Sequence, residues 1–143
     1  MKKLTSTSYS EWSFNLAMFV LRVGFGILMA AHGYEKLTHF HEMLNGTYPP
    51  MHGHAFPSMI GLGPNIELSL SIFAEFFCAM FLIIGLFTRL IAIPLIIDML
   101  VALSKAHHWD SFGQGQAATL FLLAFIIVLL CGPGRASVDG MIK

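Results

Sequence analysis

Two long apolar runs meet at a short turn near the middle of the chain, and each run carries one acidic residue. The first run, residues 66–87, contains Glu75, and the second, residues 90–103, contains Asp98. Apolar runs of this kind predict segments that lie in a lipid bilayer, where an unpartnered carboxylate costs several kcal/mol. Acids at this depth therefore indicate either a functional site or a buried ion pair that fixes the register of the helices.

The composition supports a membrane protein. Of the 143 residues, 56% are hydrophobic and 11% are charged, with a mean hydropathy of +0.73, whereas about 25% of the residues of an average soluble domain are charged. The formal net charge is zero and there is no basic run, so we expect no nucleic-acid partner. Cys78 and Cys131 stand alone without C-x-x-C spacing, which favours packed thiols over a disulfide-exchange centre.

Two further apolar runs complete the predicted fold. Residues 14–34 are long enough, at about 1.5 Å per residue, to cross a hydrocarbon core of about 30 Å, and residues 117–131 end at Gly-Pro-Gly, which stops a helix. Residues 38–64 are rich in glycine and proline, which predicts a long outer loop. We therefore expect a single all-α membrane domain over residues 1–143, a four-transmembrane-helix bundle with up-down topology.

The distribution of basic residues predicts the orientation of this bundle. With four crossings, both termini share one face with the central turn, and most of the basic residues lie there: Lys2, Lys3, Arg89, Arg135 and Lys143. The opposite face holds Lys36 and Lys105. The positive-inside rule then makes both termini cytoplasmic, and we expect a multi-pass protein of the bacterial cytoplasmic (inner) membrane, in contact with the lipid bilayer.

All seven histidines then lie at or beyond the outer surface, and four of them form two His-x-His pairs in the long loop. The pairs are His39 with His41 and His52 with His54. Because histidine is the commonest metal ligand, these four side chains are candidate ligands for copper or zinc. The alternatives are a polar outer cap without a metal and a pH-sensing surface.

Three charged residues are expected to meet inside the bundle. Arg22 and Asp98 both lie roughly 12 Å from the inner face by helical rise, and Glu75 lies slightly further out. We expect Arg22 to pair with Asp98, which leaves Glu75 free to take a proton, and we assign these three as the candidate catalytic residues. Gly26 and Gly33 share a face with Arg22, which lets a neighbouring helix approach closely.

A polar stripe along the second predicted helix leads towards Glu75. Glu67 and Ser71 precede it at intervals of four residues, so that the three share one face, which must contact protein or water. With His32 and Lys36 near the outer end of the first helix, Glu67 and Ser71 are candidate cofactor contacts. The apolar side chains around Glu75 are suited to surround the head group of a quinone.

These residues combine in an order that resembles the DoxX family of small four-helix membrane proteins. The matching stretches, between Leu21 and Asp139, are LRVGFGILMAAHGYEKL, AEFFCAMFLIIGLFTRLIAIPLIIDMLVAL and GPGRASVD. The resemblance implies the four-helix fold, and a link to quinone-coupled oxidation of reduced sulfur compounds or to membrane redox complexes with soluble partners. The positions that match the family pattern are Arg22, His32, Gly33, Lys36, Glu75, Arg89, Arg135 and Asp139.

The leading hypothesis is a small membrane subunit of a quinone-linked redox system, as a component of a quinone-dependent oxidoreductase. No haem, flavin or iron–sulfur ligation is visible in the sequence, so the quinone itself or a protein partner has to carry the electrons. Two alternatives stay open. One is a transporter or metal-handling protein that uses the outer histidines, and the other is an assembly or scaffold subunit without chemistry of its own. The glycine-lined helix faces are also compatible with a homo-oligomer.

Overall fold

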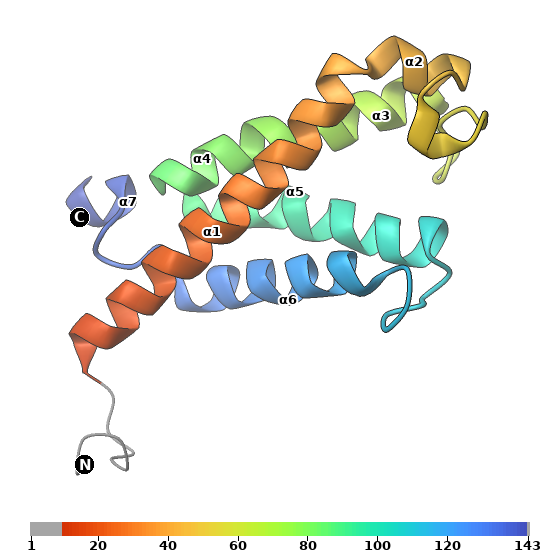
Figure 1. Cartoon of the computed structure of the whole chain (residues 1–143). Coiled ribbons are helices and arrows are strands. Elements are labelled where there is room, and N and C mark those ends of the chain that lie inside the picture. Colours follow the sequence, from red (N-terminus) through yellow and green to blue (C-terminus); the bar gives the residue numbers. More distant parts are fainter. Residues whose placement is uncertain (1–9, 143) are drawn as a thin grey trace.

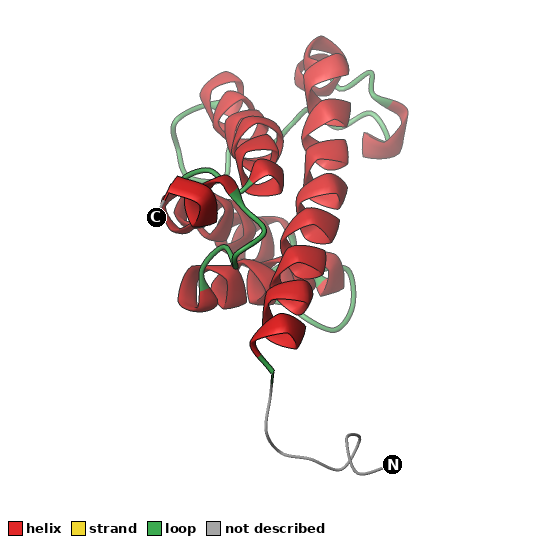
Figure 2. Cartoon of the chain, turned by 90° about the vertical axis from the view of Figure 1, so that its left-hand side faces the viewer, coloured by secondary structure: helices red, strands yellow, loops and turns green. Residues whose placement is uncertain are grey.

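The computed structural model describes residues 10–142, and all regular structure in this range is helical (Figure 2). The long segments are α1 (Glu11–Thr38), the continuous helix formed by α3 (Pro64–Ile72), η2 (Phe73–Cys78) and α4 (Ala79–Ile84), the helix α5 (Thr88–Val101) with its extension η3 (Ala102–Ala106), and α6 (Gln116–Cys131). The short helices are α2 (Phe40–Asn45), η1 (Pro49–Met51) and α7 (Val138–Ile142). Lys2, Lys3 and Lys143, which contribute to the predicted orientation, lie outside the described residues.

The four predicted helices are present in the predicted order, and the all-α prediction is confirmed for the described part of the chain. Helix α1 extends beyond the predicted 14–34 at both ends, and it begins where the Ser10 side chain accepts a hydrogen bond of 3.1 Å from the backbone N–H of Ser13. Residues 11–38 and 64–84 are long and apolar enough, by length and composition, to cross a membrane.

The chain reverses direction at each connection between long helices (Figure 1). The start of α1 and the helix α7 lie at one end of the bundle, which we call the terminal end, and the α1–α3 and α5–α6 connections lie at the other, which we call the loop end. Helices α5 and α6 run side by side, and α1 crosses them. The core between these helices contains fully buried apolar side chains, among them Met29, Leu82, Leu95, Phe125 and Val128.

The connection from α1 to α3 is packed against the bundle. The short helix α2 ends at Gly46, whose positive φ of 71° places it in the left-handed conformation that glycine adopts without strain. Met43 and Tyr48 of this connection are buried together with Leu68 and Ile72 of α3 in a second apolar cluster. The predicted loop is therefore a folded cap over the N-terminal end of α3.

Candidate functional site

An ion pair links α1 to the second long helix near the loop end. The Nζ atom of Lys36 lies 2.7 Å from Glu75 Oε1 and 2.7 Å from the hydroxyl oxygen of Ser71. The Glu75 side chain is 6% exposed and that of Lys36 is 24% exposed. The ammonium group therefore neutralises a buried carboxylate and also reaches towards the surface.

The backbone brings these two side chains together through a close helix contact. Glu75 lies in η2, a π-helical stretch, and π-helical turns within α-helices are frequent at functional sites. A Cβ atom at Gly33 would overlap the backbone of Glu75 and Phe76. The absence of a side chain at Gly33 thus lets α1 touch η2, and Lys36 lies almost one helical turn further along α1.

Helix α5 adds a second acid to this pair. The carboxyl group of Asp98 interacts with that of Glu75, with the Ser71 hydroxyl and with the charge of Lys36. The second carboxyl oxygen of Glu75, Oε2, is buried and has no hydrogen-bond partner among the described residues. We call Lys36, Ser71, Glu75 and Asp98 the acid cluster. It places two carboxyl groups beside a single cation.

A cavity of about 290 Å³ opens beside the acid cluster, with Ser71 and Asp98 in its wall. Glu67 is the third ionisable or hydroxyl-bearing residue that lines it. The other lining side chains are apolar and come from residues 56–60, from α3 and η2, and from α5 and η3: Phe56, Met59, Ile60, Leu70, Phe73, Pro94, Ile97, Val101 and Ala102. At the rim, Leu70, Phe73 and Ile97 are half exposed on the helix surface. An apolar molecule can therefore reach the cavity from the side of the bundle.

Arg22 does not belong to this cluster, and the predicted Arg22–Asp98 pair is wrong. Its Nη1 atom donates to the carbonyl oxygens of Leu82 at 2.9 Å and Ile83 at 2.7 Å, and its Nη2 atom donates to that of Ala136 at 2.5 Å. Fourteen residues separate Arg22 from Lys36, which corresponds to roughly 21 Å along α1. Arg22 instead binds carbonyl groups in the last turn of α4, where the Leu82 oxygen also accepts from the backbone N–H of Gly85 at 3.1 Å.

Two of the four candidate cofactor contacts lie in the acid cluster and two do not. Ser71 and Lys36 do, as described above. Glu67 lines the cavity, but its carboxylate accepts hydrogen bonds from the Ser58 hydroxyl at 2.7 Å and from the backbone N–H groups of residues 59, 60 and 62. The ring of His32 packs edge-on against Phe121 of α6, with 5.8 Å between ring centroids, and is exposed. Glu67 therefore anchors a loop, and His32 faces a different helix.

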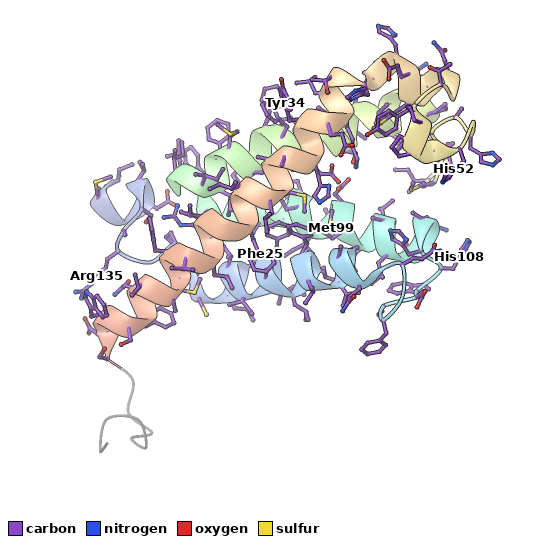
Figure 3. The ribbon with its side chains drawn as sticks, viewed as in Figure 1. Phe25, Tyr34, His52, Met99, His108 and Arg135 are labelled. Carbon is purple, nitrogen blue, oxygen red and sulfur yellow. The ribbon has the colours of Figure 1, made fainter. Side chains whose placement is uncertain are left out.

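The four loop histidines do not form a common site. The His39 ring packs 4.9 Å from that of Tyr48, and His41 contacts its neighbour Phe40. His52 and His54 are exposed, and Figure 3 shows His52 directed outward at the loop end. Across residues 10–142, no group of three or more His, Cys, Asp or Glu side chains is placed to hold a metal ion. Copper or zinc binding therefore stays a prediction from the sequence.

The structure also contains a polar pair that the sequence did not indicate. The Tyr48 hydroxyl donates a hydrogen bond to the Glu35 carboxylate. This bond to a negative group raises the pKa of Tyr48, and burial and the charge of Glu35 act in the same direction. The pair joins the end of α1 to the packed loop. Because thirteen residues separate the partners, no helical periodicity relates them.

Together these features define a class: a small helical membrane protein with apolar helices of membrane-spanning length and a charged cluster between them. The model of the DoxX family matches residues 17–108, from α1 to the end of η3. The chain belongs to the DoxX family. A match was found neither among curated proteins nor among solved structures.

Proposed function

We propose that this protein is a membrane subunit of a quinone-linked redox system, and that its acid cluster exchanges protons with a quinone in the neighbouring cavity. The observation that carries the proposal is the cavity itself, which is largely apolar and has the Asp98 carboxyl group and Ser71 in its wall. A quinone head group is a flat apolar ring with carbonyl oxygens, so such a cavity matches both parts of it. The exposed rim allows the molecule to enter from the lipid.

The charges of the acid cluster support a role in proton transfer. Two ionised carboxylates beside the single ammonium group of Lys36 would leave one net negative charge in apolar surroundings, which is costly. A proton shared by Glu75 and Asp98 removes this charge, and it also gives the unpartnered Glu75 Oε2 atom a hydrogen bond. We therefore assign to the two acids one exchangeable proton, held as a coupled pair.

The reaction requires both protons and electrons. Reduction of a quinone to a quinol takes two electrons and two protons, and the two protons end on the two carbonyl oxygens. Asp98 is the acid of the cluster that lines the cavity, so it is the donor to one quinone oxygen, and the cluster is reprotonated before the second transfer. The electrons come from a protein partner that carries a redox centre.

We also infer that the four long helical segments cross the membrane, with both termini in the cytoplasm of a bacterium, as a multi-pass protein of the cytoplasmic membrane. The reversal of chain direction at each connection supports this inference (Figure 1). Figure 3 shows Arg135 at the terminal end and His52 and His108 at the loop end. Arg89 also lies at the terminal end, beside Gly132, so these arginines agree with the positive-inside rule.

Quinone binding provides the test. The purified protein in lipid nanodiscs is titrated with decylubiquinone, and lipid extracts of the preparation are analysed for co-purified quinone. We expect saturable binding that Asp98→Ala weakens about tenfold, or about 1.4 kcal/mol, the range of one hydrogen bond. Ile93→Ala is the matched control, because Ile93 is an exposed residue of α5 that does not line the cavity.

If the unaltered protein does not bind decylubiquinone saturably and contains no quinone, the proposal fails. Copper or zinc in the purified protein in place of quinone would favour the metal-handling alternative. If mutation of the helix surfaces removes a larger complex that co-purifies with the protein, and changes the binding of neither quinone nor metal, the scaffold alternative is favoured.

A further inference from the structure

Lys36 and Asp98 are both partly exposed members of the acid cluster: Asp98 lies in the wall of the cavity, and Lys36 lies near the end of α1. The Lys36 side chain is 24% exposed, whereas that of Glu75 is 6% exposed. Lys36 lies two residues before the end of α1 at Thr38, at the loop end of the bundle. Lys36 therefore offers a route for a proton between the two acids and the loop end that does not pass through the apolar cavity.

Apolar packing closes the route from the acid cluster towards the terminal end of the bundle. Side chains with at most 1% exposure occupy the core that the cluster shares with the terminal end: Met29, Cys78, Ala79, Leu82, Leu95 and Phe125. On α5, the hydroxyl group towards the terminal end is that of Thr88, which is fully buried and lies ten residues from Asp98, roughly 15 Å away. Residues 90–97 of α5, which lie between Thr88 and Asp98, are all apolar, so this helix offers no short polar route for a proton from that end.

Other titratable side chains on the helices that form the cluster, and at the ends of these helices, either have partners elsewhere or are exposed. On α1, His32 packs against Phe121 and Glu35 accepts from Tyr48. On α3, Glu67 is held by the loop. His39 follows at the end of α1 and packs on Tyr48, and on η3, Lys105 is exposed. None of these groups has a hydrogen bond or ion pair to the acid cluster among those found in residues 10–142.

We propose that Lys36 is the proton-exchange residue of this protein, which passes protons between the Glu75–Asp98 pair and the water at the loop end. When Asp98 has given its proton to a quinone oxygen, the ammonium group of Lys36 donates a proton to the carboxylate pair. The neutral amine then takes a proton from water at its exposed side. The use of these protons rests on the proposed function, but the exchange itself requires no quinone.

Lysine suits this task for a chemical reason. An ammonium group can lose its proton when a strong acceptor lies beside it, whereas a guanidinium group keeps its proton in proteins. The variant Lys36→Arg therefore keeps the positive charge and the hydrogen-bonding capacity of the cluster but cannot pass a proton on. It separates proton exchange from the structural role of the ion pair.

The experiment follows the exchange of the shared proton by infrared spectroscopy. The protein in lipid nanodiscs, without added quinone, is transferred from H₂O to D₂O, and the shift of the carboxylic C=O stretching band is timed. Asp98→Asn and Glu75→Gln assign the band. We expect rapid exchange in the unaltered protein, and exchange slowed by about tenfold or more in Lys36→Arg with the band retained.

Two controls match this variant. Thr88→Val removes the buried hydroxyl on the terminal side with little change in shape, and Lys105→Arg makes the same chemical change at an exposed site on the loop side. Both are expected to exchange at the rate of the unaltered protein. Lys36→Gln, which also cannot relay a proton, replaces Lys36→Arg if the larger side chain prevents folding, as judged by thermal unfolding.

Exchange in Lys36→Arg and Lys36→Gln at the unaltered rate overturns the proposal, as does slowing in Thr88→Val. Absence of a protonated carboxyl band from the unaltered protein overturns it as well. The two proposals fail separately, because slowed exchange in Lys36→Arg together with no binding of decylubiquinone supports the role of Lys36 and rejects the quinone site.

Discussion

The two cations inside α1 are used in different ways that match their chemistry. Arg22 is 1% exposed and donates to three carbonyl oxygens that come from two separate parts of the chain. Its planar group with five donors suits such a set of acceptors. Lys36 places a compact charge between a hydroxyl oxygen and a carboxylate. Arg22→Lys would therefore leave part of this set of carbonyl oxygens without its donor.

The sequence predicted which polar residues share a face but not which cation they meet. Ser71 and Glu75 do lie together, because the spacing of four residues fixes their relative direction along one helix. The pairing of Arg22 with Asp98 was wrong because it rested on depth alone. Depth follows from counting residues, whereas the rotation of each helix about its axis depends on packing between helices.

The Tyr48–Glu35 pair leads to a prediction about alkaline pH. The hydrogen bond to Glu35 raises the pKa of Tyr48 above its ordinary value of 10.0. The stability that this bond contributes is therefore present at pH values below about 10 and is lost as the pH rises through the pKa of the folded protein. Glu35→Gln removes the negative acceptor, so we expect the Tyr48 phenolate to appear at lower pH.

Phenolate absorbance during an alkaline titration of the folded protein measures this shift. Tyr48→Phe identifies the contribution of Tyr48, and Tyr34→Phe, which removes an exposed tyrosine, serves as the control. A titration curve of Tyr48 that Glu35→Gln leaves unchanged would contradict the prediction.

Among the elements, the contact between α1 and η2 determines the geometry of the site. Close approach at Gly26 and Gly33 was predicted from the sequence, and a Cβ atom at either position would meet the neighbouring helix. The π-helical stretch was not predicted, because residues 73–78 have an ordinary apolar composition. A π-helical turn depends on how a helix packs and bonds locally, and hydrophobic periodicity does not report it.

Gly33→Ala is expected to destabilise the protein, because the added methyl group overlaps the backbone of Glu75 and Phe76. Overpacking of this kind costs about 1–3 kcal/mol. Gly24→Ala is the matched control in the same helix, since a Cβ atom there meets nothing within 4 Å. Thermal unfolding in detergent measures both. Equal melting temperatures for the two variants would show that α1 does not touch η2 at Gly33.

The connection between α1 and α3 shows what composition can and cannot predict about a loop. Its prolines and glycines correctly excluded a long regular helix. They did not reveal α2, or the anchoring of residues 58–62 by Glu67. Glu67 was predicted to contact a cofactor because it lies on the same stripe as Glu75. In the structure, the Glu67 carboxylate instead accepts hydrogen bonds from backbone N–H groups of residues 59, 60 and 62 in the loop.

Glu67→Ala is expected to release residues 58–62 from the N-terminal end of α3. The loss removes an acceptor for the Ser58 hydroxyl and for three backbone N–H groups, and hydrogen bonds to a charged group are stronger than those between neutral groups. Amide hydrogen exchange, read by mass spectrometry, should become faster in this segment than in the unaltered protein. Glu42→Ala, at an exposed position of α2, is the control, and equal protection in both variants would argue against the anchor.

For the molecule as a whole, polar contacts hold the helices at both ends of an apolar core. At the loop end, the acid cluster connects α1, η2 and α5. At the terminal end, Arg22 connects α1 to the end of α4 and to Ala136. The Asp139 carboxylate accepts hydrogen bonds of 2.8 Å from the backbone N–H groups of Phe87 and Thr88, where α5 begins. The segment after α6 therefore closes the terminal end.

The contacts of this segment were not predicted from the sequence. Its Gly-Pro-Gly start correctly indicated the end of α6, but the contact between Arg22 and Ala136 joins residues that are 114 positions apart. Local patterns carry no information about contacts at such a separation. Arg22 and Asp139 are both among the positions that match the family pattern. The structure gives a physical reason for this, because both residues bind backbone groups that flank the α4–α5 turn.

Asp139→Ala should release the C-terminal segment from the α4–α5 turn. The variant loses two hydrogen bonds from backbone N–H groups to a carboxylate, and it leaves those N–H groups without their acceptor at the start of α5. Limited trypsin digestion in detergent measures the release, since a mobile segment is cut faster after Arg135. Glu11→Gln is the matched control: it breaks the Glu11–Arg135 ion pair of 2.7 Å, but exposed pairs contribute only about 0–1 kcal/mol. Cleavage should therefore accelerate in Asp139→Ala and hardly change in Glu11→Gln. The reverse order would mean that the exposed ion pair, and not the cap on α5, holds the segment against the bundle.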